Sequence, residues 1–329
     1  MKYTACATLL LVASLAQAGC NNDFRDCSEV DASAAESLPQ SLSQTGLYGD
    51  IANDVVVDAA ILFEPEFPLW TDGATKRRWL VLPESGQVDT TNPDEWVFPV
   101  GTKFFKEFTR DSTRLETRLN TRTADGWTGV AYIWNESGDD AVRQLDVAED
   151  VKGTTHDVPS AVQCLACHGG RGNFSLGFSA TQLAPETRSD LYDAGFLSDR
   201  VDAELQLEPI ARAGLGTLHG NCAHCHNSRR DEQPQATSCY APPVNDDDDP
   251  IDFSLPPDLA SVEEAPAVRT ARWQLGELDD SALLDRISTR NLSLADDASM
   301  PPLGTEVVDD RMVETIEAFI ATLPPRVER

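Results

Sequence analysis

Two short cysteine motifs carry the most specific chemistry in this sequence. Residues 164–168 are CLACH and residues 222–226 are CAHCH, so both follow the spacing C-x-x-C-H. In this spacing each thiol forms a thioether bond with one vinyl group of haem, and the adjacent histidine becomes the proximal iron ligand. Only about 0.003 such motifs are expected by chance from this composition. The sequence therefore predicts two haem c groups, held by Cys164, Cys167, His168, Cys222, Cys225 and His226.

Paired cysteines have two other common uses, as zinc ligands and as dithiol redox sites. The separation between the two pairs is long for a single zinc site, and a histidine directly follows the second cysteine in both. An exported chain also meets oxidising conditions. These features favour haem attachment over zinc or dithiol chemistry.

The second iron has a clear candidate for its sixth ligand. Met300 lies in a proline-stiffened loop, Met300-Pro301-Pro302, ahead of a C-terminal amphipathic segment. A small cytochrome c domain keeps its methionine ligand in this place, and thioether ligation raises the reduction potential. We expect His226 and Met300 to hold the second iron.

The distal side of the first iron is less well defined by the sequence. His156 and His219 are the candidates opposite His168, and an open, five-coordinate iron is the third alternative. His224 lies between two haem-attaching cysteines and is expected to face solvent.

Two predicted helices frame the second motif. Residues 208–219 are expected to form a helix that leads into the motif. Residues 309–323 place apolar side chains at i, i+4, i+7, i+8 and i+11, with acidic residues at the N-terminus and Pro324 and Pro325 at the end. The order helix, motif, methionine loop, helix is that of a class I-like cytochrome c domain.

The region before the first motif has a different pattern. Residues 79–82, 96–98, 103–108 and 129–134 show short apolar alternation bounded by turn residues, which predicts antiparallel strands. Five of the six tryptophans fall in this region and are expected to be core. Several strands at this spacing favour a sandwich-like sheet or a single curled one.

The N-terminus predicts export. A lysine, a short apolar run and small residues form a signal peptide over residues 1–19. Cys20 is the predicted lipidation site, although cleavage by an ordinary signal peptidase after Ala18 is an alternative. If Cys20 is lipidated, Cys27 and Cys239 remain as a possible disulfide pair.

Together these patterns predict an α+β multidomain chain, with a mainly-β, sandwich-like domain followed by a mainly-α, cytochrome c-like region. The expected parts are a flexible tether at 20–50, a β-rich domain at 51–150, a first haem-binding segment at 151–206 and the class I-like domain at 207–326.

The net charge of −29, from 55 acidic and 26 basic residues, argues against nucleic acid or an anionic membrane surface as partner. It favours a basic redox partner through electrostatic steering, although solubility alone is an equally good reason for the charge.

Several segments together resemble one family, the exported bacterial dihaem c-type cytochromes. The resemblance spans nearly the whole chain after the tether and rests on residues 67–74 (FPLWTDGA), 96–103 (WVFPVGTK), 116–119, 132–135, 163–169, 218–226 and 299–304 (SMPPLG). It implies haem binding, electron transfer and a periplasmic or outer-membrane location with a lipid anchor. An acidic insert at 229–256 departs from the family pattern.

Three functions are consistent with these observations. The first is an electron carrier between redox proteins of the cell envelope, with no substrate of its own. The second is a haem enzyme, peroxidase-like or oxidase-like, that acts at an open first iron. The third is a binding module formed by the β-rich half and joined to a redox domain.

Overall fold

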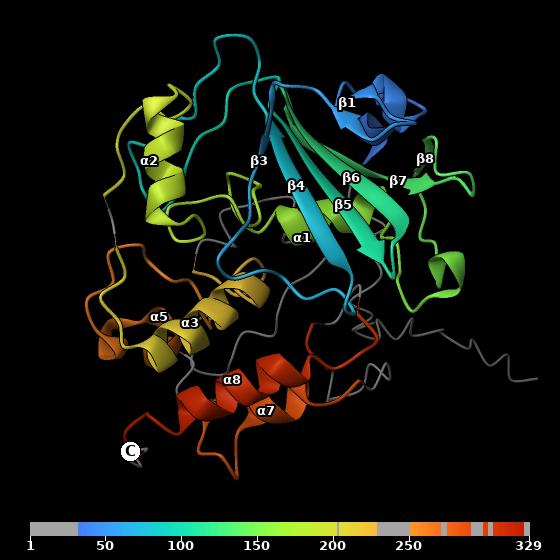
Figure 1. Ribbon diagram of the computed structural model, residues 1–329. Helices are drawn as coiled ribbons and strands as arrows, with labels where there is room; N and C mark the ends of the chain where they lie inside the picture. Colours follow the sequence, from blue (N-terminus) through green and yellow to red (C-terminus); the bar gives the residue numbers. More distant parts are fainter. Residues whose placement is uncertain are drawn as a thin grey trace, which may run out of the picture.

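A computed structural model describes residues 32–202, 204–228, 251–270, 275–290, 299–301 and 305–325. The signal peptide at 1–19, Cys20, Cys27, Cys239 and most of the acidic insert lie outside the described residues. Within those residues the chain has the predicted α+β composition, with a sheet-containing N-terminal part and a helical C-terminal part (Figure 1). None of the described helices combines the length and the apolar character that a membrane crossing requires.

The main sheet is an antiparallel meander in which the six strands follow one another in chain order. The hairpin between the third and fourth of these strands turns on Asp111 and Ser112, which both have positive φ angles. Two such residues make the tight turn whose twist matches that of the strands. The strands are β3 (Ala60–Leu62), β4 (Thr75–Val81), β5 (Lys103–Arg110), β6 (Thr113–Thr123), β7 (Gly126–Trp134) and β8 (Ala141–Gln144).

One face of this sheet is covered by the segment that precedes it, and the predicted flexible tether is wrong for residues 32–50. Leu42 and Leu47 are fully buried and pack with Trp79 and Trp134 in one hydrophobic cluster. The segment lacks long apolar runs, but a few well-placed side chains are enough to anchor it. Its short elements are η1 (Ser33–Ser37), η2 (Leu42–Gln44) and the two-stranded sheet of β1 (Tyr48–Asp50) and β2 (Val55–Val56).

The opposite face carries a second cluster, which also includes residues far along the chain. Phe98 and Trp127 pack there with Leu165, Phe174 and Phe178. The β-rich region and the first-motif segment therefore share one core. Residues 96–98 do not form the expected strand, since Val97 makes only an isolated bridge with Asp89. This part of the chain contains η3 (Val151–Gly153), α1 (Ala161–His168) and α2 (Pro185–Asp193).

The C-terminal helices have a core of their own and lie below the sheet in Figure 1. Both predicted helices are confirmed, one as α3 and one as α8. Asp309 caps α8 by accepting a hydrogen bond from the backbone N–H of Met312. The elements are α3 (Pro209–Asn221), η5 (Val262–Glu264), α5 (Pro266–Thr270), α7 (Ala282–Ile287) and α8 (Asp310–Ile320).

The segment 67–74 joins the two parts. The backbone N–H of Trp70 donates to Asn221 Oδ1 at 2.8 Å, and its indole N–H donates to the carbonyl of Val307 at 3.0 Å. The buried Asp72 carboxylate accepts hydrogen bonds from the backbone of Glu306 and Val307. This segment thereby fixes the end of α3 and the loop before α8 against the sheet.

Candidate functional site

The first motif forms most of α1, which packs against β7. A capping box begins the helix, because the Ser160 hydroxyl accepts from the N–H of Gln163 and the Gln163 side chain accepts from the N–H of Ser160. Gly129 on β7 permits the close approach: a Cβ there would lie 3.5 Å from Cys164 Cβ and 2.2 Å from Asn120 Oδ1. Helix and strand together fix where the motif side chains point.

His168, the last residue of α1, is buried and held in one tautomer. Its Nδ1 lies 2.8 Å from the carbonyl of Phe174. Because a carbonyl only accepts, Nδ1 carries the proton. The amide nitrogen of Asn120 lies 3.2 Å from Nδ1 and 3.3 Å from Nε2, and in this tautomer it can donate only to Nε2. Burial lowers the pKa of His168 to about 3, and the charge of Lys106 acts in the same direction. A neutral imidazole with Nδ1 bound to a carbonyl is the usual state of a metal-ligating histidine.

A cavity of about 320 Å³ opens beside the first motif, and we call it the first-motif cavity. Its volume falls in the range of cofactor pockets. One wall is the β5–β6 face of the sheet and another is α1, while residues before η3, the second motif and the loop before α8 complete it. The chemically active side chains that line it are Lys76, Lys106, Arg118, Asn120, Asp150, Asp157, Cys164, Cys167, His168, His224 and Glu306.

The sheet beside this cavity carries an unusual row of positive charge, of which Lys106 and Arg118 line the cavity. Arg78 is directly opposite Lys106, and Lys106 is directly opposite Arg118, in register across β4, β5 and β6. Like charges in such positions destabilise a sheet. Arg118 is paired with the buried Glu116, but no described residue hydrogen-bonds or ion-pairs with Lys106. Burial, with Arg78 and Arg118 adding to it, lowers the pKa of Lys106 to about 7. The row is suited to an anionic ligand.

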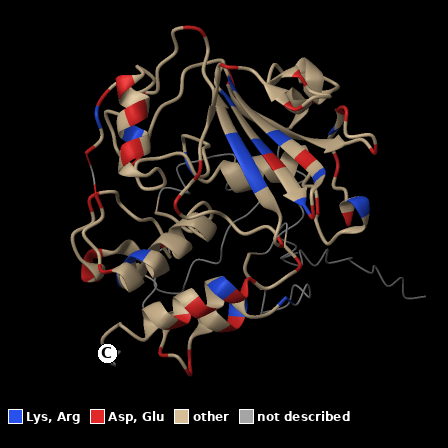
Figure 2. Ribbon diagram, viewed as in Figure 1, with Lys and Arg blue, Asp and Glu red and all other residues tan. Residues whose placement is uncertain are grey.

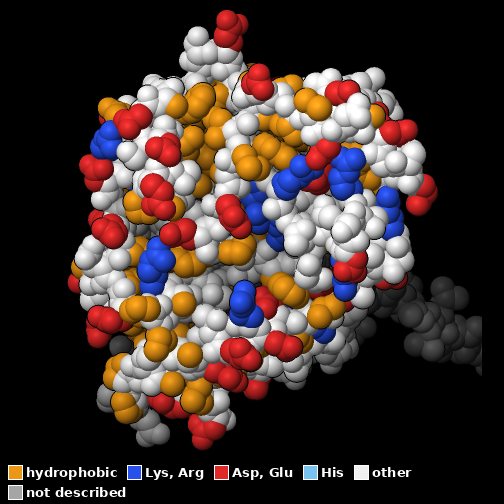
Figure 3. Space-filling model, viewed as in Figure 1, with side chains coloured by type: hydrophobic (Ala, Val, Ile, Leu, Met, Phe, Trp, Pro, Cys, Tyr) orange, Lys and Arg blue, Asp and Glu red, His pale blue; other side chains and the backbone are white. Residues whose placement is uncertain are grey.

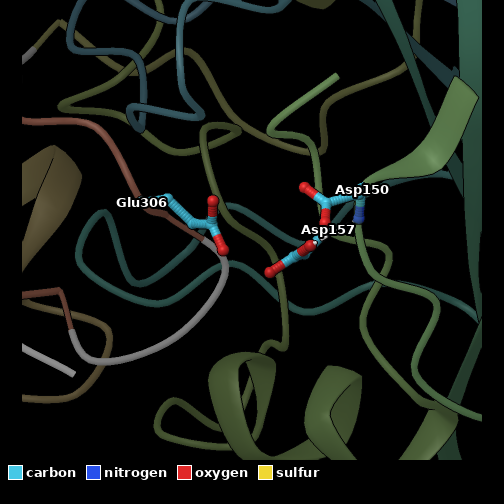
Figure 4. A group of neighbouring side chains, drawn as sticks. All are labelled: Asp150, Asp157 and Glu306. Atoms are coloured by element: carbon cyan, nitrogen blue, oxygen red, sulfur yellow. Dashed lines mark hydrogen bonds between the residues drawn. The ribbon is translucent and has the colours of Figure 1, made fainter. Parts of the chain in front are cut away.

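The cavity also has a carboxylate corner formed by Asp150, Asp157 and Glu306. One oxygen from each lies within 4.8 Å of the others, and Figure 4 shows the three side chains converging from two separate segments. Burial and the neighbouring carboxylates raise the pKa of Glu306. Positive and negative charge are thus separated across one cavity.

The second motif directly follows α3, and its segment packs against the first. Cys222 packs against the C-terminal hydrophobic cluster, and Ala223 is buried within it. The His226 ring meets Phe253 edge to face at 5.6 Å. Asn227 donates to the carbonyl of Gly170 at 3.1 Å, which joins the residues just after each motif.

Neither predicted distal histidine lies in the first-motif cavity. His156 is 3% exposed, and its Nε2 bonds to Glu116 Oε1 at 2.7 Å, while its ring packs 5.2 Å from Phe108. His219 lines a separate polar cavity, where its Nδ1 accepts from the backbone N–H of Leu255. These placements argue against both as ligands opposite His168.

His224 differs from the expectation of a solvent-facing ring. It is only 9% exposed and lines the first-motif cavity together with the side chains of the first motif. The pattern C-x-x-C-H does not say where the intervening residues point, because this depends on what packs on the second motif.

Met300 is partly buried against the same hydrophobic cluster as Cys222. Its backbone is held on both sides, since its N–H donates to the carbonyl of Arg286 at 2.9 Å and its carbonyl accepts from Arg290 at 2.8 Å. The following residue, Pro301, reaches the first-motif cavity. The methionine loop therefore lies between the two motif regions.

The arrangement is poorly suited to zinc. Structural zinc sites need four ligands, and catalytic ones three, that converge on one point. Among the described residues, the only group of three or more potential ligands that converge is the carboxylate corner, and it contains no cysteine or histidine.

The sequence analysis did not assign five of the residues that line the first-motif cavity. They come from four separate segments and are Trp70, Lys106, Arg118, Asn120 and His224. The even-numbered residues of β5 and β6 share a sheet face, which is the pattern that could have found Lys106, Arg118 and Asn120. Comparison of the chain with protein-family models, with curated proteins and with solved structures finds no match.

Proposed function

We propose that this chain is a dihaem c-type cytochrome that carries electrons in the cell envelope. The first motif holds one haem through Cys164 and Cys167, with His168 as proximal ligand. The second motif holds the other through Cys222 and Cys225, with His226 in that role. The iron of each group supplies a one-electron change between its ferrous and ferric states.

The observation that carries this proposal is the environment of His168. Its Nδ1 is held by the Phe174 carbonyl, which makes Nε2 the acceptor nitrogen of the ring, and an iron bound there would take the place of the Asn120 amide. The motif cysteines line the same cavity. Lys106, a half-buried lysine that lines this cavity and has no hydrogen-bonded or ion-paired partner among the described residues, offers a counter-charge to the propionate carboxylates that every haem carries.

The second haem is proposed to have His226 and Met300 as its two ligands, within a cytochrome c-like helical region. Packing supports this pairing of ligands, because Cys222 and Met300 contact one cluster of α3, α7 and α8 side chains. The backbone bonds to Arg286 and Arg290 would hold the methionine loop in place.

The surface suits a basic redox partner. Among the helices in Figure 2 the carboxylates lie mainly on α2 and α8, and several of the lysines and arginines in Figure 3 lie over the strands. With a net charge of −29, association with a basic partner would be fast and sensitive to salt. We place the protein in the periplasm or at the outer membrane, held by a lipid on Cys20.

The test is haem stoichiometry. The full chain is expressed in a host that matures c-type cytochromes, and a pyridine haemochrome assay is combined with intact mass. Two haems are expected in the natural chain and one after Cys164→Ala with Cys167→Ala, or after Cys222→Ala with Cys225→Ala. Ala166→Ser, at a variable position of the first motif, serves as the control and retains both. A colourless, folded protein would refute the proposal.

A further inference from the structure

A second cavity, of about 290 Å³, lies between the segments that follow the two motifs, and we call it the His219 cavity. Its volume is close to the lower end of the range for small-molecule sites. Its walls come from the residues just after each motif, the last turn of α3 and the segment 252–256. The side chains that could recognise a ligand there include Asp94, Glu95, Arg171, Asn173, His219 and Asp252.

One wall of the His219 cavity is held in place by side chains from two other segments. The backbone N–H of Leu255 donates to His219 Nδ1 at 3.1 Å, and the hydroxyl of Ser254 accepts from Arg171 Nη2 at 2.8 Å. Because Ser254 and Leu255 are consecutive, Arg171 and His219 meet the same short stretch of this wall. Polar groups that are fixed before a ligand arrives lower the entropic cost of binding.

Two N–H donors of this cavity have no partner among the described residues. Since Leu255 donates to Nδ1, the neutral ring of His219 carries its proton on Nε2, and nothing accepts from that nitrogen. Asn173 is 6% exposed, and its Oδ1 accepts from the backbone N–H of Ser175 at 3.2 Å, while its Nδ2 donates to no group. Beside the positive charge of Arg171, these donors suit a carboxylate.

The same cavity contains a buried carboxylate that lacks a cation. Asp252 is 6% exposed, and its two oxygens accept from the backbone N–H groups of Ser254 at 2.8 Å and Ser228 at 3.2 Å. No described lysine, arginine or histidine forms an ion pair with it. Buried carboxylates are usually paired with a positive charge. An ammonium group on a ligand would supply that charge.

We propose that the His219 cavity binds a free α-amino acid. Arg171, Asn173 and His219 would hold its carboxylate, and Asp252 would hold its ammonium group. A simple carboxylate would leave Asp252 without a cation, and a simple amine would leave the two N–H donors unpaired, so the site selects a ligand that has both charges. None of the six residues proposed to attach or ligate haem in the two motifs lines this cavity, so the inference stands apart from the proposed function.

Isothermal titration calorimetry of the full chain tests the proposal, with L-alanine and L-lysine as probes. Acetate and methylammonium each carry one of the two charges and serve as matched comparisons. We expect the amino acids to bind, and each single-charge probe to bind weaker by about tenfold or more, since it loses charged hydrogen bonds. L-Glutamate should bind more weakly than L-alanine, because Asp94 and Glu95 line the same cavity.

The variant is Asp252→Asn, which removes the charge with little change of shape and should weaken L-alanine binding by about tenfold or more. Asp258→Asn, the same change at an exposed carboxylate outside the cavity, should bind like the natural protein. An unchanged affinity in Asp252→Asn, or equal weakening in both variants, overturns the inference.

Two results on the natural protein also overturn it. One is the absence of binding by both L-alanine and L-lysine, and the other is acetate that binds as tightly as L-alanine, which would make the cavity a simple anion site. If Asp252→Asn folds poorly, the comparison of acetate and methylammonium with L-alanine on the natural protein decides. Haem stoichiometry is measured separately, so failure here is distinguishable from failure of the proposed function.

Discussion

The side chain of Asn227 donates to the carbonyl of Gly170 at 3.1 Å and to the carbonyl of Ala223 at 2.8 Å. These bonds tie the residue after the second motif to the segment that follows the first motif. Asn227 is buried, so both bonds are formed away from water, where loss of a partner is costly. The two motifs are therefore neighbours in the fold, as the proposed electron transfer between two haems would require.

The proposed Met300 ligand can be tested by Met300→Ala. Removal of the thioether should abolish the sulfur-to-iron charge-transfer absorption and lower one of two midpoint potentials by on the order of 100 mV. Optical redox titration measures both. The control is Met312→Leu, since Met312 is buried on α8 in the same hydrophobic cluster. Met312→Leu should lower the free energy of unfolding by less than about 1.5 kcal/mol and should retain the sulfur-to-iron absorption. Retention of the band in Met300→Ala would eliminate Met300 as ligand.

Lys106→Gln tests the row of positive charge that Arg78, Lys106 and Arg118 form across β4, β5 and β6. A nearby positive charge disfavours the oxidised iron, so its removal should lower the potential of the first haem. An interaction of about 1 kcal/mol corresponds to roughly 40 mV for a one-electron couple. Lys103→Gln is the matched control, because Lys103 is on the same strand but donates to the carbonyl of Thr45 on the opposite face. Equal shifts in both variants would contradict a specific role for Lys106.

Part of the loss of folding stability at low pH should arise from the protonation of Glu116. Burial opposes its ionisation, but Arg118 and the bond from His156 outweigh this, and the pKa of Glu116 lies below the usual 4.5. The folded state therefore gains stability above pH 4.5, and this gain is lost as the pH falls through the folded pKa. Urea unfolding of the natural protein at pH 7 and at successively lower pH values should show the loss begin below about pH 4.5.

Glu116→Gln should remove this part of the pH dependence. It should also destabilise the protein at pH 7 by about 3–5 kcal/mol, because Arg118 and His156 lose their charged partner in a buried site. The exposed Glu136→Gln is the control and should stay within about 0.5 kcal/mol of the natural protein. A Glu116→Gln variant as stable as this control would show that the ion pair contributes little.

The packing of helix α3 against the segment 67–74 requires a glycine at position 216. A Cβ at Gly216 would lie 2.0 Å from the ring of Phe67, which is itself buried. Gly216→Ala should therefore cost about 1–3 kcal/mol through overpacking, in spite of the higher helix propensity of alanine. Thermal or urea unfolding measures the cost. Ala213→Ser, at an exposed position of α3, should change stability by less than about 0.5 kcal/mol.

Local signals in the sequence predicted several elements correctly. The apolar spacing over residues 309–323 gave α8, and the alternation over residues 103–108 and 129–134 gave β5 and β7. Such patterns depend only on neighbours along the chain. The segment 32–50 was misjudged because its burial depends on Leu42 and Leu47 meeting a sheet face built from residues 79–134.

By itself the sequence predicted the chemistry proposed for the two motifs, because thioether attachment and proximal ligation need residues that are close together in the chain. Only the tertiary structure decided what surrounds them. Lys106, Asn120 and His224 come to the first-motif cavity from two strands and from the second motif, while His156 turns away to Glu116. These contacts join residues tens of positions apart, and packing of helix on sheet, which no local pattern encodes, brings them together.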